Sequence, residues 1–183
     1  MAFSSVHPFL VVLAAERGIE LVISRLNEIR IKRLGGQEYG AGFTRLLTGF
    51  HACWFFSFGI EAAATGAKLL ASPASLITEF LACQAWRYWC VISLGRYWNI
   101  KIITLHGAEP VRAGPYRLFR HPNYAVVLLE IFLYPALFGC WVTALVFGLS
   151  NIFILKERIR QEEAALLISS ATGPGTIPSG RSA

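Results

Sequence analysis

The stretch GPYRLFRHPNY, Gly114 to Tyr124, leads directly into the apolar run AVVLLEIFLYPALFGCWVTALVFGLSNIFIL, residues 125–155. An apolar run of this length predicts helix, and Pro135 and Gly139 interrupt it without a polar loop. We therefore expect two helices, at 122–138 and 139–157, joined as a tight hairpin. The alternative is one long kinked helix, but about 35 residues at about 1.5 Å each would far exceed the roughly 30 Å apolar layer of a bilayer.

Three further apolar runs precede this hairpin and predict helices at roughly 5–26, 43–65 and 74–95. Of the 183 residues, 55% are hydrophobic and 15% are charged, and the mean hydropathy is +0.51. Soluble domains usually carry about 25% charged residues. The predicted fold class is therefore an all-α, multi-pass transmembrane helical bundle of about five spans. One integral-membrane domain would cover 1–168, and the small, Gly/Pro-rich segment 169–183 is expected to be a disordered tail.

Basic residues predict the orientation of this bundle. Fourteen of the seventeen Lys and Arg residues fall in the segments that would share one side, whereas the opposite side has Lys68 alone. The positive-inside rule then places the N-terminus outside and the C-terminus in the cytoplasm, as in a bacterial inner-membrane protein. The first apolar run has no preceding basic region and contains Glu16, Arg17 and Glu20, so we expect it to be retained and not cleaved as a signal peptide.

The same distribution argues against two other classes of protein. The net charge of +6 is compatible with nucleic-acid binding, but the basic residues lie in clusters between apolar runs and not over one folded face, so we expect no nucleic-acid partner. Cys53, Cys83, Cys90 and Cys140 lie inside apolar runs without Cys-x-x-Cys or zinc-type spacing, and no metal site is predicted.

Polar chemistry is concentrated in two segments, GPYRLFRHPNY and KERIRQEEAALL, residues 114–124 and 156–167. A helical hairpin returns the chain to the surface it left, so Arg120 and His121 should lie near Arg158, Glu162 and Glu163. One interpretation is a binding site made from both segments. The alternatives are an interfacial anchor made of arginine and tyrosine side chains, and a simple intrahelical pair between the residues at 158 and 162.

Polar residues also recur along the first predicted helix. Glu16, Glu20, Ser24 and the pair Asn27/Glu28 follow one another at intervals of three or four residues, which turns them toward one face. We expect this face to point into the bundle, because an unpaired charge in hydrocarbon costs about 2.5–3.5 kcal/mol. The candidate partners of Glu16 and Glu20 are Arg17, Arg25 and Arg87.

Two motifs carry a family resemblance. The pattern G-x-Y-x-x-x-R-H-P-x-Y at 114–124 is followed, one hairpin later, by R-x-x-x-E-E at 158–163. Together they resemble the isoprenylcysteine carboxyl methyltransferase family, over about the last seventy residues before the tail. ERGIELVISRLNE at 16–28 and RYWNIKI at 96–102 are similar to bacterial members that methylate long-chain alkylpyrones.

The resemblance implies S-adenosyl-L-methionine as cofactor, a lipophilic or lipidated methyl acceptor, and surrounding membrane lipids as partners. Arg158 would be the catalytic residue facing the acceptor. The implied cofactor-binding residues are Ala108, Glu109, Pro110, Val111, Tyr116, His121, Pro122, Asn123, Tyr124 and Glu162. The chain departs from the family pattern in the loop, where AEPV replaces a His-x-Leu-Val run and the histidine stands earlier, at His106.

These residue types suit methyl transfer to oxygen. An acceptor that is already ionised, such as a carboxylate or an acidic enol, needs positioning and electrostatic stabilisation but no general base. Two other functions stay open from the residues alone: a membrane NADPH-dependent reductase similar to sterol reductases, and a non-catalytic lipid-binding membrane protein.

Overall fold

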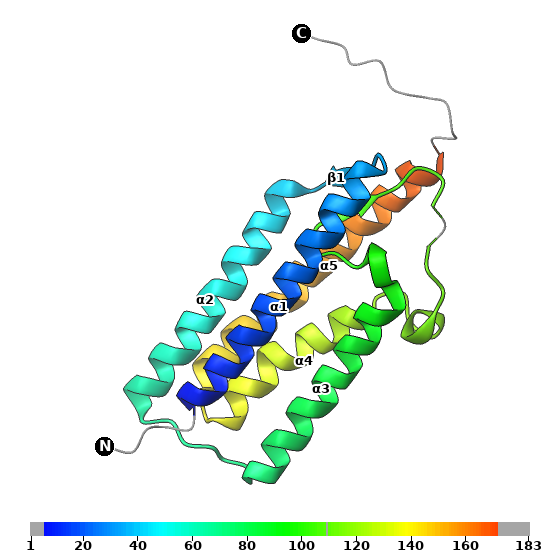
Figure 1. Cartoon of the computed structure of the whole chain (residues 1–183). Coiled ribbons are helices and arrows are strands. Elements are labelled where there is room, and N and C mark those ends of the chain that lie inside the picture. Colours follow the sequence, from blue (N-terminus) through cyan, green and yellow to red (C-terminus); the bar gives the residue numbers. More distant parts are fainter. Residues whose placement is uncertain (1–5, 109, 172–183) are drawn as a thin grey trace.

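The computed structural model describes residues 6–108 and 110–171. Its helices are α1 (Val6–Arg33), α2 (Ala41–Thr65), α3 (Pro73–Leu94), α4 (Pro122–Leu137) and α5 (Trp141–Ala171), with short 3-10 helices η1 (Gly95–Tyr97) and η2 (Gly114–Arg117). Strands β1 (Gln37–Tyr39) and β2 (Ile102–Thr104) pair antiparallel, with Glu38 opposite Ile103. The helices form one elongated bundle, and β1 lies at the end away from the α4–α5 turn (Figure 1). The predicted all-α class is confirmed.

The predicted hairpin is confirmed, and the single kinked helix is excluded. The amides of Phe138 and Cys140 donate to the carbonyl of Pro135 at 3.1 and 2.8 Å, which closes the turn after α4. Gly139 has φ 72°, a left-handed conformation that costs glycine little. The carboxylate of Glu61 on α2 accepts from the amides of Val142 and Thr143 at 3.0 and 2.7 Å, so it caps the first turn of α5.

Aromatic packing holds the half of the bundle nearest this turn. Trp54, Phe58, Tyr134 and Phe138 are buried there in one cluster with Phe9. The rings of Phe9 and Tyr134 meet edge to face, with centroids 5.1 Å apart, and Trp54 Nε1 donates to the carbonyl of Ile131 at 3.0 Å. Each fully buried large apolar side chain contributes about 1.5–3 kcal/mol, so this cluster fixes α1, α2 and α4 against one another.

Two helices extend beyond their apolar runs. α1 continues to Arg33, past the predicted end at residue 26, and α5 continues to Ala171, past the predicted end at residue 157. α5 therefore extends into the segment predicted as a tail, where Ser169 Oγ donates to the carbonyl of Leu105 at 2.8 Å. The rest of that predicted tail, 172–183, lies outside the described residues.

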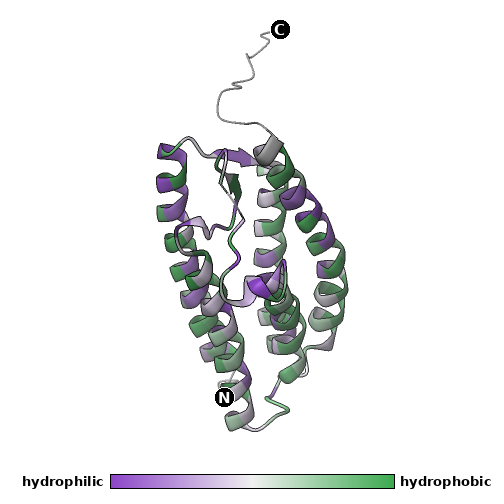
Figure 2. Ribbon diagram, turned by 90° about the vertical axis from the view of Figure 1, so that its right-hand side faces the viewer, coloured by the Kyte–Doolittle hydropathy of each residue, from purple (hydrophilic) through white to green (hydrophobic). Residues whose placement is uncertain are grey.

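The length and composition of these helices do not support the prediction that they are membrane spans. No helix within 6–108 and 110–171 is both long and apolar enough to qualify as a membrane span. α4 has 16 residues, fewer than the about 20 that a crossing needs. α1 is long enough, but Glu16, Arg17 and Glu20 lie in its middle. Figure 2 shows the hydrophilic positions gathered mainly in the half of the bundle that carries the strands.

Candidate active site

The two polar segments meet where α4 begins and the second half of α5 passes it. The phenol of Tyr124 donates to Glu162 Oε2 and accepts from Arg158 Nε at 3.2 Å. Tyr124 therefore lies between a cation and a carboxylate. This confirms the expected proximity of the two segments, and it differs from the intrahelical alternative because Tyr124 bridges Arg158 and Glu162.

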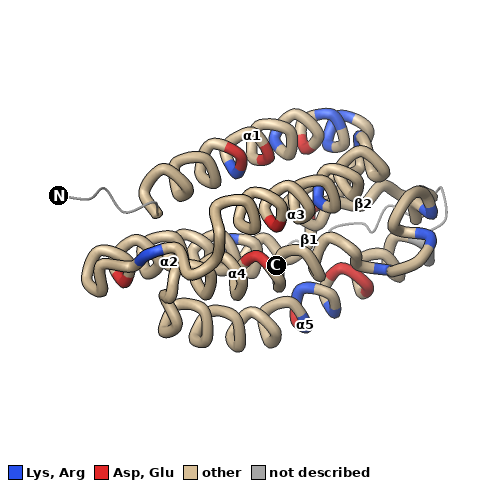
Figure 3. The backbone as a smooth tube through the Cα atoms, turned by 90° about the horizontal axis from the view of Figure 1, so that it is seen from below, with Lys and Arg blue, Asp and Glu red and all other residues tan. Residues whose placement is uncertain are grey.

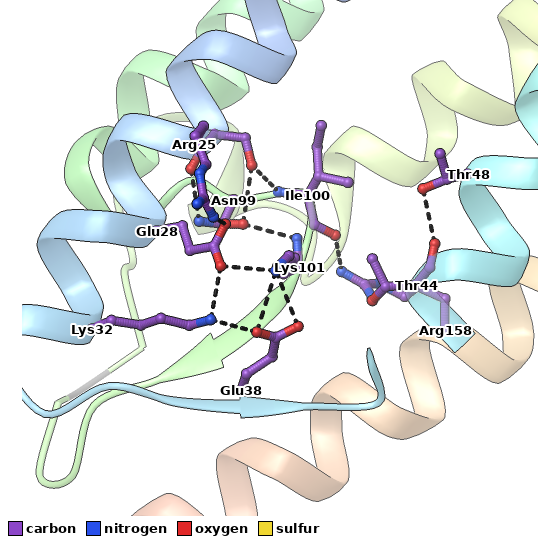
Figure 4. Close-up of polar contacts among 11 residues, drawn as sticks. Arg25, Glu28, Lys32, Glu38, Thr44, Thr48, Asn99, Ile100, Lys101 and Arg158 are labelled. Atoms are coloured by element: carbon purple, nitrogen blue, oxygen red, sulfur yellow. Dashed lines mark hydrogen bonds and ion pairs between the residues drawn. The ribbon is translucent and has the colours of Figure 1, made fainter. Parts of the chain in front are cut away.

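Arg158 is held by three separate parts of the chain. Arg158 is buried, with 3% of its surface exposed. Besides Tyr124, the guanidinium donates to the carbonyl of Ile100 at 2.5 Å and to Thr44 Oγ1 at 3.3 Å (Figure 4). A guanidinium has five N–H groups, and these contacts use three of them. Arg158 is thus fixed in orientation and keeps donor capacity for an anion.

His121 and Glu163 form the outer part of this site. His121 Nε2 lies 3.4 Å from Glu163 Oε1, and the rings of His121 and Tyr124 stack with centroids 5.5 Å apart. Arg120 Nη1 lies 3.7 Å from the same carboxylate, but its side chain is 88% exposed, so this ion pair contributes little stability. The predicted proximity of Arg120, His121 and Glu163 is confirmed.

The start of α4 is fixed by contacts that sequence reasoning missed. Trp86 Nε1 on α3 donates to the carbonyl of Pro122 at 3.1 Å. Pro122 occupies the first turn, where its missing N–H leaves no helix bond unmade. The neighbouring Asn123 Oδ1 is buried and has no hydrogen-bond partner among the described residues. Such an unsatisfied acceptor is costly in a folded protein and is available to a ligand.

The glycine and tyrosine of the first motif have a packing role. Gly114 has φ +54°, and a Cβ at this position would collide with Ser93 Oγ and come within 2.9 Å of Trp89 Nε1. Only glycine therefore lets η2 pack this closely on α3. Tyr116 in η2 is half-buried, and burial raises the pKa of its phenol, which keeps the proton on the oxygen at neutral pH.

The predicted cofactor loop lies between β2 and η2. Ala108 and Pro110 are exposed, Val111 is half-buried, and Glu109 lies outside the described residues. The amide of Ala108 donates to the carbonyl of Leu105 at 3.2 Å. Within the part of the chain that the structure describes, no hydrogen bond joins this loop to Tyr124 or Glu162. The role of Ala108 to Val111 stays a prediction.

A polar network on α1 holds the backbone that in turn holds Arg158 (Figure 4). Ser24 Oγ accepts from the amide of Ile100 at 3.0 Å and donates to Asn99 Oδ1 at 3.0 Å. Asn99 Nδ2 in turn donates to the backbone carbonyl of Ser24 at 3.1 Å. Because the Ile100 carbonyl is the acceptor for Arg158, α1 determines where the guanidinium lies.

Glu28, one turn after Ser24 on α1, binds three basic side chains next to this network. It accepts from Lys32 at 2.7 Å and from Lys101 and Arg25 at 2.8 Å each. Burial by itself would raise the pKa of Glu28, but the bonds from Lys101, Lys32 and Arg25 outweigh burial and lower the pKa to about 2. Glu38 on β1 also contacts Lys32 at 2.6 Å, so these charges connect α1 to β1 and to Lys101, the residue before β2.

A second polar cluster lies deeper in the bundle, around Arg87 on α3. Arg17 pairs with Glu20 at 2.8 Å and Glu16 at 3.1 Å, and Arg87 Nε lies 3.4 Å from Glu20. Arg87 also bonds to Glu130 on α4. The predicted inward face of α1 is confirmed. Arg17 and Arg87 are confirmed as partners of the glutamates on this face, whereas Arg25 pairs with Glu28. Figure 3 shows acidic and basic residues along the middle of α1.

Comparison with known proteins agrees with these motifs. Residues 75–168 match the sequence model of the isoprenylcysteine carboxyl methyltransferase (ICMT) family. An uncharacterized protein of Bacillus subtilis (strain 168), YpbQ, is 37% identical over 155 residues, which cover 85% of this chain and 92% of the relative. An uncharacterized protein of Haemophilus influenzae (strain ATCC 51907 / DSM 11121 / KW20 / Rd) is 28% identical over 155 residues, covering 84% and 90%. No solved structure matches significantly.

Proposed function

The chain belongs to the isoprenylcysteine carboxyl methyltransferase family, and we propose that it transfers a methyl group from S-adenosyl-L-methionine to an anionic oxygen of a lipidic acceptor. Family membership indicates a methyltransferase. The observation that carries the finer proposal is the contact chain from Arg158 through Tyr124 to Glu162, which holds a cation and a carboxylate at one place.

The residues at this place fit the cofactor. When bound, it would supply an electrophilic methyl group on a positively charged sulfur. Glu162 supplies a negative charge for the ammonium of the methionine end, and Asn123 Oδ1 supplies an unused acceptor. The stacked rings of His121 and Tyr124 present an aromatic surface to a planar base. Tyr116 and Pro122 would complete this enclosure from η2 and α4, with Ala108 to Val111 closing it from the loop.

The acceptor oxygen would be oriented by Arg158. Its guanidinium is permanently charged and planar, so it can align a carboxylate or an enolate through two N–H groups. Contacts to Ile100 and Thr44 keep it from reorienting, which lowers the cost of reaching the reactive geometry. Such an acceptor needs no base, and the carboxylate of a prenylcysteine and the acidic enol of an alkylpyrone both meet this requirement.

We also propose that the bundle is embedded in the bacterial inner membrane, with the N-terminus outside and the C-terminus in the cytoplasm. The family is membrane-associated. The mean hydropathy of a helix counts both of its faces, whereas the charges in the middle of α1 are paired inside the bundle. The outward positions of the helices are apolar and exposed, among them Ile19, Val22, Phe56, Ile60, Ile77, Leu81, Ile92, Val142 and Phe153.

Methyl transfer tests the proposed reaction. Membranes containing the full chain are incubated with S-adenosylmethionine labelled in its methyl group, and label is counted in the organic-soluble fraction. We expect base-labile label for a carboxyl ester and base-stable label for an enol ether. No transfer, together with saturable NADPH binding to the purified chain, would favour a reductase instead.

A further inference from the structure

An open groove of about 650 Å³ lies between α1 and η1, away from Arg158 and Tyr124. The groove is lined from α1 by Leu26, Ile29, Arg30 and Arg33, from the turn after α1 by Leu34, and from η1 by Arg96. The positions 26, 29, 30 and 33 share one helix face, because they are three or four residues apart. The groove therefore presents guanidinium and apolar groups side by side.

The two walls of the groove are fixed to each other. Asn27 Nδ2 on α1 donates to the carbonyl of Trp98 at 2.8 Å and to that of Gly95 at 3.2 Å, at the two ends of η1. The guanidinium of Arg96 bonds to Tyr97 Oη at 3.0 Å and lies over that ring, 5.0 Å from its centroid. A ligand would thus enter a formed groove and would not have to organise it.

The charge of this groove is uncompensated. Its neighbours on α1 are paired, since Arg25 and Lys32 both contact Glu28. By contrast, Arg30, Arg33 and Arg96 form no ion pair with a carboxylate in the described part of the chain. Three guanidiniums that face one groove repel one another, and an anion bound among them removes this repulsion and accepts planar hydrogen bonds.

The apolar lining narrows the class of anion. Two leucines that line this basic groove are exposed to solvent: 63% of Leu26 and 58% of Leu34. Val22 and Ile19 continue this exposed stripe along α1 at spacings of four and three residues before Leu26. A small soluble anion would satisfy the arginines and leave this stripe in water. A ligand with an anionic head and apolar chains covers both.

We propose that this groove binds the headgroup of an anionic phospholipid, with its acyl chains lying along Leu26, Val22 and Ile19. Basic residues beside an apolar helix face at the cytoplasmic surface of a membrane recognise such headgroups. The proposal rests on the membrane placement proposed above and is independent of the methyl-transfer chemistry. It predicts a structural lipid that remains with the purified protein.

Native mass spectrometry of the full chain in detergent tests this binding. Phosphatidylglycerol and phosphatidylcholine are added in equal amounts, without S-adenosylmethionine or acceptor. We expect one phosphatidylglycerol per chain to be retained in preference to phosphatidylcholine. Arg30→Gln with Arg33→Gln should weaken retention at least about tenfold. The matched control is Arg45→Gln with Arg112→Gln, which removes the same charge from exposed positions on α2 and before η2 and should change retention less than about twofold.

Several results would overturn the proposal: equal retention of both lipids, an equal loss in the control variant, displacement of the lipid by inorganic phosphate at equal concentration, or a groove variant that alters only the oligomeric state. If the double variant does not fold, Arg96→Gln on η1 gives the same test. Glu162→Gln should keep the lipid, so failure of the methyltransferase proposal would leave this result unchanged.

Discussion

Arg158 Nε on α5 and Tyr124 Oη on α4 lie 3.2 Å apart, although they are 34 residues apart in the chain. The same phenol oxygen donates its proton to Glu162. One tyrosine thus connects the residue proposed to orient the acceptor with the residue proposed to bind the cofactor. Because the three side chains share hydrogen bonds, substitutions among them should not act independently.

Arg158→Lys should impair acceptor use and spare the cofactor. Lysine keeps the charge but loses the planar group that contacts Ile100, Thr44 and Tyr124 at once. We expect kcat/KM for the acceptor to fall about 100-fold. The dissociation constant for S-adenosylhomocysteine should change less than about threefold. A larger loss of cofactor affinity than of turnover would contradict the assigned role.

Tyr124→Phe should weaken both functions together. The substitution removes the hydrogen bonds of the Tyr124 hydroxyl to Glu162 and to Arg158. A hydrogen bond to a charged group contributes about 1.5–3 kcal/mol. We expect about tenfold losses in cofactor affinity and in turnover, measured by calorimetry and by methyl transfer. Tyr39→Phe is the matched control, because its hydroxyl contacts Gln37 on β1. Equal effects of both substitutions would show that the loss is not specific to the site.

Ser24→Ala should lower turnover although Ser24 does not contact Arg158. Without the hydroxyl, the amide of Ile100 loses its acceptor, and the carbonyl that holds Arg158 is released. We expect about 1–2 kcal/mol lower stability and a several-fold lower kcat, with cofactor affinity unchanged. Ser24→Thr should restore turnover. Thr78→Ala removes an exposed hydroxyl on α3 as a control, and an equal kcat loss there would refute the positioning role.

Acid should destabilise the protein partly through Glu28. Its pKa is about 2 in the folded protein against an ordinary value of 4.5, so unfolding takes up a proton between these values. The contribution of Glu28 to the free energy of unfolding is therefore complete above about pH 5 and is lost as the pH falls toward 2. Melting temperatures measured from pH 6 to pH 3 should fall more steeply for the natural chain than for Glu28→Gln. Parallel curves would contradict this.

The features that were predictable from the sequence are those with periodic or paired signals. The apolar runs gave the five helices, Pro135 and Gly139 gave the hairpin, and the spacing of Glu16, Glu20 and Ser24 gave the inward face of α1. The proximity of the two polar segments followed from the hairpin itself. Each of these rests on a local pattern or on the geometry of one connection.

The remaining features depend on groups that leave no such signal. The acceptor for Arg158 is a backbone carbonyl, which any residue at position 100 would supply. β1 and β2 have three residues each, too few for an alternating pattern to be recognised. Glu130 is a lone carboxylate within an apolar run, and it pairs in the structure with the buried Arg87 on α3, a partner that no local sequence pattern identifies. α1 and α5 end later than their apolar runs predict, because charged residues continue both helices.

The measurement that tests the central claim most directly is calorimetric binding of S-adenosylhomocysteine to the full chain in detergent, for the natural sequence, Glu162→Gln and Glu157→Gln. Glu157 lies on the same helix but pairs with Arg160 at 2.7 Å on the exposed side, so its substitution controls for loss of one charge. The account predicts saturable one-to-one binding that weakens at least about tenfold in Glu162→Gln and is unchanged in Glu157→Gln. Absence of binding to the natural sequence, or equal affinity for Glu162→Gln, would contradict it.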